Sequence, residues 1–366
     1  MQRCRRIVVL GALIIGTAIL LGGQSRAAAQ TDPRWDNSYC LSCHEGSSLG
    51  IPLPSGETLD IAVDGHEYAD SVHGKLDVAC VLCHTDISTY PHAPITAESR
   101  RGFTLQMYTS CATCHYSEYT GTRDSDHELA RQAGVTEAAV CTDCHGSHNV
   151  QPPGEPRTNI PLMCRKCHSE IYNAYEDSVH GEALTTGNPD VPTCTDCHGV
   201  HDVKGPHDDS PFRLFSPQIC ADCHANKALM DKYGISTNVF SSYLSDFHGT
   251  TVVLFEKLAP GQDTNKPVCV DCHGVHDIKA PSDTDSSVYK KNLLGTCRRC
   301  HPDATANFPD AWLSHYAPST TEAPLVYWVN MFYKILIPLV IGAMLLAVGL
   351  DVRRRLAARL RRRRHD

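Results

Sequence analysis

Eighteen of the nineteen cysteines in this 366-residue chain occur in nine copies of one short pattern, Cys-x-x-Cys-His. Two thiols three residues apart lie on one side of a helical turn, so both can reach the two vinyl groups of one porphyrin. The histidine that follows at once then meets the metal, and a neutral imidazole is a good ligand for iron. The pattern therefore predicts covalent attachment of c-type haem.

The nine copies predict nine haem c groups with iron, eighteen thioether bonds and nine proximal ligands. The predicted thioether cysteines are Cys40, Cys43, Cys80, Cys83, Cys111, Cys114, Cys141, Cys144, Cys164, Cys167, Cys194, Cys197, Cys220, Cys223, Cys269, Cys272, Cys297 and Cys300. The predicted proximal iron ligands are His44, His84, His115, His145, His168, His198, His224, His273 and His301.

Zinc sites, redox dithiols and a disulfide framework also use many cysteines. A disulfide framework has no need of a histidine after every second cysteine, and zinc sites would not use all the motif cysteines in so uniform a pattern. Haem attachment explains both the cysteines and the histidines, so we favour it.

Alignment on the cysteines shows a lone first motif followed by four two-motif units. The units pair the motifs that begin at Cys80 with Cys111, Cys141 with Cys164, Cys194 with Cys220, and Cys269 with Cys297. Each unit has one histidine ahead of its first motif and a second histidine soon after that motif. Repeats this regular are typical of an elongated, modular array.

The repeated histidines outside the motifs are predicted to be the distal iron ligands. They are His73, His92, His127, His148, His180, His201, His248, His276 and His315. His92 departs from the pattern, because it follows His84 by eight residues, and either His66 or His207 could replace it. The remaining histidine, His365, lies in the C-terminal tail.

Chain geometry restricts which histidines can share an iron. His168 and His180 lie on a segment with Ile171, Tyr175 and Val179 at helical spacing, and a continuous helix would separate the two histidines by about 18 Å. We therefore expect them to bind different haems.

The pair His198 and His201 is too close in sequence for the chain to pass around one macrocycle. We expect His201 to ligate a neighbouring haem, which would bring two porphyrins into near contact. Glycines accompany both types of distal histidine: Gly146, Gly199 and Gly274 would permit the sharp turn, and Gly74, Gly181 and Gly249 would suit a left-handed cap that ends a helix.

The N-terminal residues 1–29 have the features of a secretory signal peptide, with basic residues, an apolar run over 7–23 and three alanines at 27–29. Haem attachment outside the cytoplasm needs such export. The alternative is that the apolar run stays uncleaved as a second membrane anchor. Cys4 precedes the run and is assigned no role.

Residues 325–350 form an apolar stretch long enough for a transmembrane helix. Tyr327, Trp328 and Tyr333 fit an aromatic belt at its entrance, and the basic tail, 351–366, fits the cytoplasmic side under the positive-inside rule. We therefore expect a single-pass protein of the cytoplasmic membrane, with its C-terminus in the cytoplasm and residues 30–324 extracytoplasmic.

The net charge of −8 hides an asymmetry, because residues 30–324 alone carry about −19. Such a charge makes nucleic acid an unsuitable partner and would steer a basic redox partner to this surface. Aromatic residues make up only 7% of the chain, so the porphyrins must supply much of the core.

The expected fold is mainly α, with a large irregular fraction, almost no sheet and one C-terminal transmembrane helix. Within the nonahaem domain, the lone haem would occupy residues 36–60, and the two-haem units about 61–120, 121–172, 173–235 and 236–316.

The doubled motifs and the Cys-His-Gly-x-His segments at His148, His201 and His276 make residues 36–316 similar to the multihaem cytochromes c of respiratory bacteria and archaea. The resemblance implies that haems with two histidine ligands carry electrons, as in anaerobic respiration. Catalytic members keep one iron open or replace a proximal histidine by lysine, and no motif here ends in lysine. The C-terminal anchor resembles those of cytochromes that dock on a membrane cytochrome b or another quinone-oxidising subunit.

These features predict a membrane-anchored nonahaem conduit between a quinone-linked membrane partner and soluble or surface redox partners outside the cytoplasm. It is expected to be an electron carrier rather than an enzyme, without catalytic residues. One alternative is a multihaem oxidoreductase of small nitrogen or sulfur compounds at an open iron, and another is a conducting filament assembled end to end.

Overall fold

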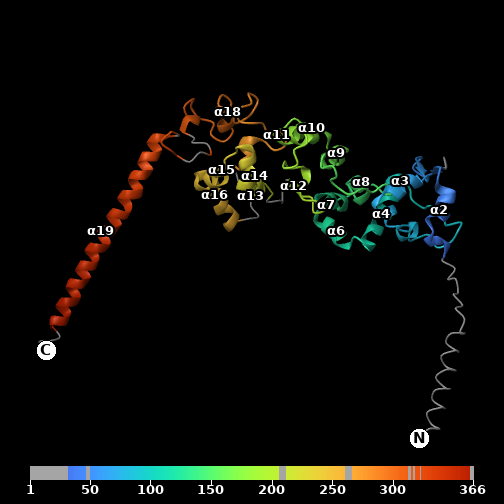
Figure 1. The fold of residues 1–366 in the computed structure, drawn as a ribbon, viewed down its shortest axis with the longest axis horizontal. Helices are drawn as coiled ribbons and strands as arrows, with labels where there is room; N and C mark the ends of the chain where they lie inside the picture. The colour runs from blue at the N-terminus through green and yellow to red at the C-terminus, as the bar shows by residue number, and fades with distance from the viewer. Residues whose placement is uncertain are drawn as a thin grey trace, which may run out of the picture. The chain divides into compact units, whose positions relative to one another are not determined.

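The computed structural model describes residues 32–46, 50–205, 212–259, 266–311, 315, 318–321 and 323–362. The predicted signal peptide, Cys4, His207 and His365 lie outside these ranges. The described chain is mainly helical, in short segments joined by turns and irregular stretches, as predicted (Figure 1).

The chain divides into two compact units, residues 1–153 and 154–366, and each is described by itself. The boundary falls inside the segment 121–172 that the repeat marks as one two-haem unit. The first unit contains the helices α2 (Asn37–His44), α3 (Gly65–Asp70), α4 (Val72–Lys75), α5 (Arg100–Met107), α6 (Tyr116–Gly121), α7 (Asp126–Gln132) and α8 (Cys141–His145), the strands β1 (Gly50–Pro52) and β2 (Thr58–Asp60), and the 3-10 turns η1 (Pro33–Trp35), η2 (Cys80–Leu82), η3 (Tyr108–Thr113) and η4 (Thr122–Asp124).

The described part of the second unit has helices and 3-10 turns joined by irregular stretches, and no strand. Its elements are α9 (Asn159–Arg165), α10 (Ser169–Glu176), α11 (Val179–Thr185), α12 (Cys194–His198), α13 (Phe212–His224), α14 (Lys227–Met230), η5 (Asp231–Tyr233), α15 (Asn238–Ser245), α16 (Phe247–Leu258), α17 (Cys269–His273), α18 (Leu293–Arg298), η6 (Pro309–Ala311) and α19 (Pro324–Arg362).

One small hairpin is the sheet content of the described residues. β1 pairs with β2 in antiparallel register, with Ile51 opposite Leu59. The hairpin follows the first motif directly, and the chain after it returns to that motif through a hydrogen bond between His44 Nδ1 and the Ile61 carbonyl, 2.8 Å long. The expectation of almost no sheet is confirmed.

The continuous helix predicted across His168 and His180 is wrong. α10 ends at Glu176, and α11 begins at Val179. Ser178 separates them because its hydroxyl accepts the Gly181 N–H at 3.1 Å and so caps a new helix.

The hydrophobic core is small. In the part of the chain that the structure describes, one cluster of buried apolar residues is found, formed by Leu214, Val252 and Val268 with Val270 packed against it. A chain with so little apolar packing of its own needs other groups to fill its interior, as expected for a protein built around porphyrins.

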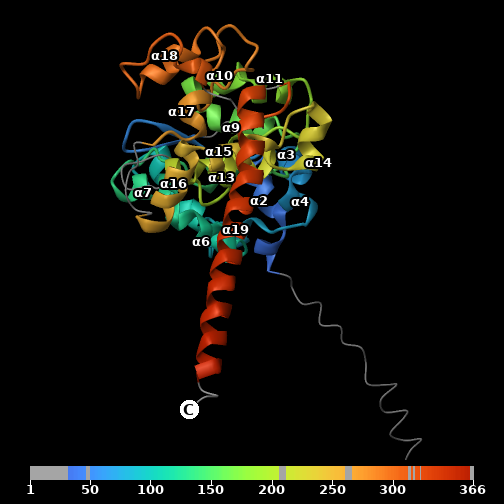
Figure 2. The same ribbon diagram turned by 90° about the vertical axis from the view of Figure 1, so that its left-hand side faces the viewer.

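α19 differs from every other described helix in length and composition. It is the one described helix long and apolar enough to cross a membrane, over Pro324–Arg359, and Figure 2 shows it as a single long helix, in red. Its large apolar side chains are mostly exposed. The predicted span, 325–350, lies within it. This agrees with a single-pass membrane anchor.

Candidate haem centres

Each motif lies on a single helical turn or at the end of a helix. Five motifs lie within α2, α8, α12, α13 and α17, and the other four begin inside η2, η3, α9 and α18. In the motifs on the 3-10 turns, the histidine N–H donates to the carbonyl of the first cysteine, at 2.9 Å for both His84 and His115. This turn places both thiols on one side, as the haem pattern requires.

The motif cysteines are at least partly accessible in the described residues. None of the eighteen forms a disulfide, and their exposure is intermediate or high. Among these same residues there is no cluster of three or more histidine, cysteine or acidic side chains arranged to hold a metal ion.

Seven proximal histidines face a predicted distal histidine across a nearly constant gap. The distances between ring centroids are 6.2 Å for His44–His92, 6.1 Å for His73–His115, 6.1 Å for His84–His148, 6.4 Å for His180–His224, 6.0 Å for His198–His276, 6.3 Å for His248–His301 and 6.2 Å for His273–His315.

This gap fits one iron between two imidazoles. An imidazole nitrogen lies about 2 Å from a metal that it binds, and its ring centroid is roughly 1 Å further away, so the two centroids would be about 6 Å apart. Ordinary ring packing would not produce such uniform spacing at seven places. The residues present therefore fit haem irons with two histidine ligands.

The interplanar angles divide the seven pairs into two groups. The angle is 14° to 23° in the near-parallel pairs, which are His44–His92, His84–His148, His198–His276 and His273–His315. It is 46° to 53° in the tilted pairs, which are His73–His115, His180–His224 and His248–His301.

The two groups coincide with two positions in the sequence repeat. In a tilted pair, the leading histidine of a unit faces the second motif of the same unit, as His180 faces His224. In three near-parallel pairs, the histidine that follows the first motif of a repeat unit faces the opening motif of the unit before it, or the lone first motif, as His276 faces His198. In the fourth, His315 follows the last motif and faces His273, in the opening motif of its own unit. The structure thus places His276, and not His201, opposite His198.

The irregular His92 follows the same rule, because it faces His44 of the lone first motif. His66 lies exposed at the start of α3 and takes no part in this pair. Iron ligation by the paired histidines stays a prediction that their geometry fits. Distal ligation by His127 and His201, and proximal ligation by His145 and His168, stay predictions from the sequence.

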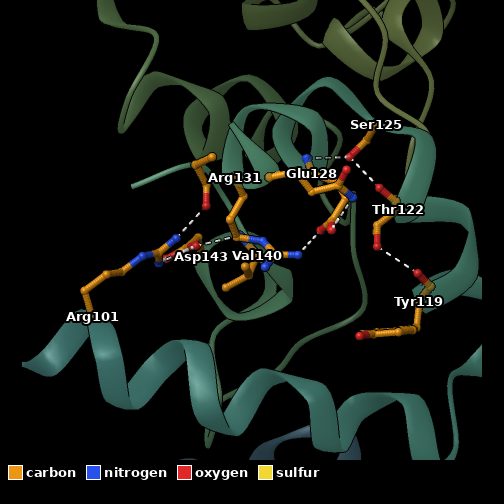
Figure 3. A network of polar contacts seen from close by, with 10 residues as sticks. Arg101, Tyr119, Thr122, Ser125, Glu128, Arg131, Val140 and Asp143 are labelled. Carbon is orange, nitrogen blue, oxygen red and sulfur yellow. Dashed lines mark hydrogen bonds and ion pairs between the residues drawn. The ribbon is translucent and has the colours of Figure 1, made fainter. Parts of the chain in front are cut away.

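The leading histidines are held at the second position of a capped helix. α4, α7, α11 and α16 begin directly after the N-cap residues Ser71, Ser125, Ser178 and Asp246. The three serines are buried, and each accepts a backbone N–H from the first turn. Figure 3 shows this cap at Ser125, which accepts from Glu128 at 3.2 Å and donates to the Thr122 carbonyl at 2.7 Å.

The role predicted for Gly74, Gly181 and Gly249 is wrong. These glycines lie in the first turns of α4, α11 and α16, and none has the left-handed backbone of a helix end. A Cβ at each would collide with the carbonyl oxygen of Tyr68, Tyr175 or Tyr243, respectively. Glycine is needed there because the preceding helix passes so close to the helix of the distal histidine.

Sequence reasoning missed these three tyrosines. The Tyr68, Tyr175 and Tyr243 hydroxyls donate to the carbonyls of Val78, Pro192 and Pro267, each two residues before the first cysteine of a motif. Burial raises the pKa of all three, that of Tyr68 to about 12. The recurrence of tyrosine five residues before His73, His180 and His248 was the available signal.

The glycines of the other type do make the sharp turn expected of them. Gly146, Gly199 and Gly274 have φ of 74°, 82° and 84°, a region that side chains other than glycine rarely adopt. Each follows its motif helix directly, so the turn redirects the chain between the proximal histidine and the distal histidine three residues later.

Several ring nitrogens that would face away from iron already have partners. His198 Nδ1 lies 2.5 Å from the Lys204 carbonyl, and His315 Nδ1 lies 3.2 Å from the Ser242 hydroxyl. Such bonds orient an imidazole and leave its other nitrogen for a metal.

Burial favours the neutral form, which is the form that binds iron, in seven of the facing imidazoles. It lowers the pKa of His180 to about 4, with a further contribution from His224. Burial also lowers the pKa of His84, His148, His224, His273, His276 and His315.

Consecutive motifs are neighbours in space within each of the two compact units, 1–153 and 154–366. In the first compact unit, burial is the main cause of the raised pKa of Cys80 and of Cys83. The Cys40 thiol adds to the shift of Cys80, and the Cys111 and Cys114 thiols add to that of Cys83. A hydrogen bond with Cys141 lowers the pKa of Cys111 to about 7.

The second unit repeats the arrangement. A hydrogen bond with Cys194 lowers the pKa of Cys164 to about 7, and a hydrogen bond with Cys269 raises that of Cys220. The Cys197 pKa is raised to about 11 by burial and by Cys220. Burial raises the pKa of Cys272, and the last motif adds to the shift through Cys297 and Cys300. The attachment points thus follow one another in sequence order.

Comparison with known families agrees with this geometry. The family model described as Cytochrome c3 matches residues 72–169, a segment with four of the nine motifs. No solved structure matches the chain. Members of that family carry c-type haem and transfer electrons. The family match, the motifs and the facing histidines together identify the chain as a member of the multihaem cytochrome c superfamily.

Proposed function

We propose that this protein is a membrane-anchored cytochrome with nine c-type haems, which carries electrons between a quinone-linked membrane partner and redox partners outside the cytoplasm. The observation that carries the proposal is the order of the motifs. Within each unit, consecutive motifs are close enough for their thiols to interact, so porphyrins attached there would form a row.

When bound, haem iron gains and loses single electrons. The residues of this chain decide whether the iron has an open position for a substrate. A second histidine faces seven of the nine predicted proximal ligands. An iron with two protein ligands has no position for a small substrate. This favours transport of electrons over reduction of a nitrogen or sulfur compound.

The membrane part of the proposal rests on α19. Its apolar part is followed by Arg353, Arg354, Arg355 and Arg359, which fit the cytoplasmic side of a membrane. His315 precedes α19 by only nine residues, so the last motifs would be held near the membrane surface. That position suits electron exchange with a membrane cytochrome b or another quinone-oxidising subunit.

Outside the membrane, the charge of the haem domain points to a basic partner. Residues 32–71 around the first motif contain eight acidic residues and one basic residue, Arg34. A surface of one sign accelerates the approach of a partner of the opposite sign, and salt weakens the effect.

The test uses the full-length protein in its native membranes. A haemochrome assay should give nine haems per chain, and a redox titration should show low-spin haems over a range of potentials. Menaquinol should reduce them in these membranes, but not in membranes whose quinone-oxidising subunits are inhibited. Clearly fewer haems, or no reduction by menaquinol, would refute the proposal. A high-spin iron that binds cyanide or nitrite without losing a histidine would support the oxidoreductase instead.

A further inference from the structure

An aspartate inside three motifs forms an ion pair with an arginine distant in the sequence. The aspartates are the third residues of the motifs that begin at Cys141, Cys194 and Cys269. The ion pairs are Arg101–Asp143 at 2.9 Å, Arg157–Asp196 at 2.7 Å and Arg213–Asp271 at 2.6 Å. Figure 3 shows the first of them.

Each of these carboxylates also caps the turn of its own motif. Asp143 accepts the Val140 N–H at 2.7 Å, and Asp196 and Asp271 accept the Thr193 and Val268 N–H groups at 2.6 Å. The aspartate is therefore part of the helical turn that carries the two cysteines.

Each arginine binds the backbone ahead of the same motif as well. Arg101 donates to the Ala138 carbonyl at 2.5 Å, Arg157 to the Pro189 carbonyl at 2.6 Å, and Arg213 to the Lys266 carbonyl at 3.0 Å. A guanidinium can hold a carboxylate and a carbonyl together because its donors are fixed in one plane. An exposed ion pair alone would contribute little, and these side chains are partly exposed.

The arginine in turn belongs to the segment that leads into the preceding motif. Arg101 is in α5, which runs into the motif of Cys111, and Arg213 is in α13, which contains Cys220. The first cysteines of these neighbouring motifs are close enough for a hydrogen bond between their thiols, Cys111 with Cys141 and Cys220 with Cys269. The same holds for Arg157, which precedes Cys164, the neighbour of Cys194.

The motifs of Cys40 and Cys80 are also neighbours, but no arginine–aspartate ion pair joins them in the described residues. Asn37 takes the place of such a pair: its Oδ1 accepts the Cys80 N–H at 2.9 Å, and its Nδ2 donates to the Val78 carbonyl at 3.0 Å. The same link between two motifs is thus made four times, with two different sets of residues.

We propose that Asn37 and the three arginine–aspartate pairs are positioning residues, which set the separation of the two haems attached at each of these motif pairs. The inference rests on the proposed function, since close and constant separation is what electron passage between neighbours needs. Each link joins the turn of one motif to the segment that carries the preceding motif. Loss of the link would let the two motif turns move apart.

The aspartate also carries a charge near its motif, and this effect has to be separated from positioning. The chain offers a matched control in Asp222, which is the third residue of the motif of Cys220 and is exposed. Its carboxylate accepts from Gln218, four residues earlier in the same helix, and among the described residues it has no bond to a second motif. D222N therefore removes the same charge at the same motif position without breaking a link.

The experiment compares D271N, R213Q, R213K and D222N in the full-length, haem-loaded protein. Pulsed electron paramagnetic resonance measures the dipolar coupling between neighbouring ferric haems, which depends on their separation. D271N, R213Q and R213K should weaken one coupling and slow electron exchange within that haem pair several-fold, because lysine keeps the charge but lacks the planar fork. D222N should shift a potential and leave every coupling unchanged.

The proposal is overturned if R213K matches the wild type, or if D222N changes a coupling as much as D271N does. Should R213Q lose a haem, Asn37→Ala tests the same claim at the first pair, where a weakened coupling is expected and an unchanged one refutes it. Dipolar coupling does not depend on the electron donor. Failure of the wild-type protein to take electrons from menaquinol would therefore count against the proposed function and not against positioning.

Discussion

The imidazole of His276 lies opposite that of His198, with the ring centroids 6.0 Å apart and the planes 22° from parallel. Three residues before His276 stands His273, the proximal histidine of the next motif, which faces His315 instead. One short stretch of chain thus places imidazoles opposite two different partner histidines. With haem bound at each pair, this arrangement would tie each haem to the segment that carries its neighbour.

Replacement of His276 by alanine should open the iron of the haem attached at Cys194 and Cys197. The proximal ligand His198 would stay, so one haem should become high-spin and bind carbon monoxide when reduced, while the haem count is unchanged. Electron paramagnetic resonance and a carbon monoxide difference spectrum measure this.

The control for this variant is His66→Ala, because His66 is exposed and takes no part in a described imidazole pair. It should leave every haem low-spin. If H276A were also fully low-spin, the assignment of His276 to this iron would be wrong.

The two groups of interplanar angles predict two groups of low-spin ferric signals. Near-parallel imidazoles split the iron orbitals more than crossed imidazoles do, so axial-ligand orientation is visible in the spectrum. The pairs at 14° to 23° should give rhombic signals, and those at 46° to 53° should give signals with a larger highest g-value.

Single variants can assign these signals. H276A should remove intensity from the rhombic group, and H180A from the other, since His180 belongs to a tilted pair at 49°. Loss of intensity from the same group in both variants would contradict the two classes.

The sequence was sufficient for those features that depend on residue type and local spacing. The motif turns, the helical character and the sharp turn at Gly199 follow from local chemistry. The break between α10 and α11 was missed because the apolar spacing of Ile171, Tyr175 and Val179 suggested one helix, whereas capping by Ser178 decides the outcome.

Long-range pairings could not be predicted, because they depend on how segments pack. Nothing local indicates that His198 should face a histidine 78 residues later, or that Arg101 should reach Asp143. The repeat of aspartate in three motifs was visible, but the partner arginines stand 42, 39 and 58 residues before the aspartates that they bind.

Gly181→Ala should disturb the haem attached at Cys220 and Cys223. The added methyl group would overlap the Tyr175 carbonyl, so α11 would have to move and carry His180 away from His224. Overpacking of this kind costs about 1–3 kcal/mol. Thermal unfolding should begin earlier, and part of one haem should become high-spin at low temperature.

Gly295→Ala is the matched control. Gly295 is also helical, in α18, but a Cβ there meets no atom within 4 Å. Alanine is preferred to glycine in a helix by up to about 1 kcal/mol, so this variant should be as stable as the wild type or slightly more so. Equal losses in the two variants would show that close passage of α10 is not the reason for glycine at 181.

Tyr175→Phe should weaken the link between the helix pair that carries His180 and the motif of Cys194. The hydroxyl donates to the Pro192 carbonyl at 2.7 Å, and its removal should cost about 1 kcal/mol. In a unit of this size, such a loss lowers the unfolding midpoint by about 2–4 °C. The low-spin spectrum should be unchanged at low temperature, since the tyrosine lies beside the ligands and is not one of them.

Tyr116→Phe removes a hydroxyl from a tyrosine that is 69% exposed and should not change the midpoint. An unchanged midpoint in Tyr175→Phe would mean that the hydroxyl does not hold the two segments together.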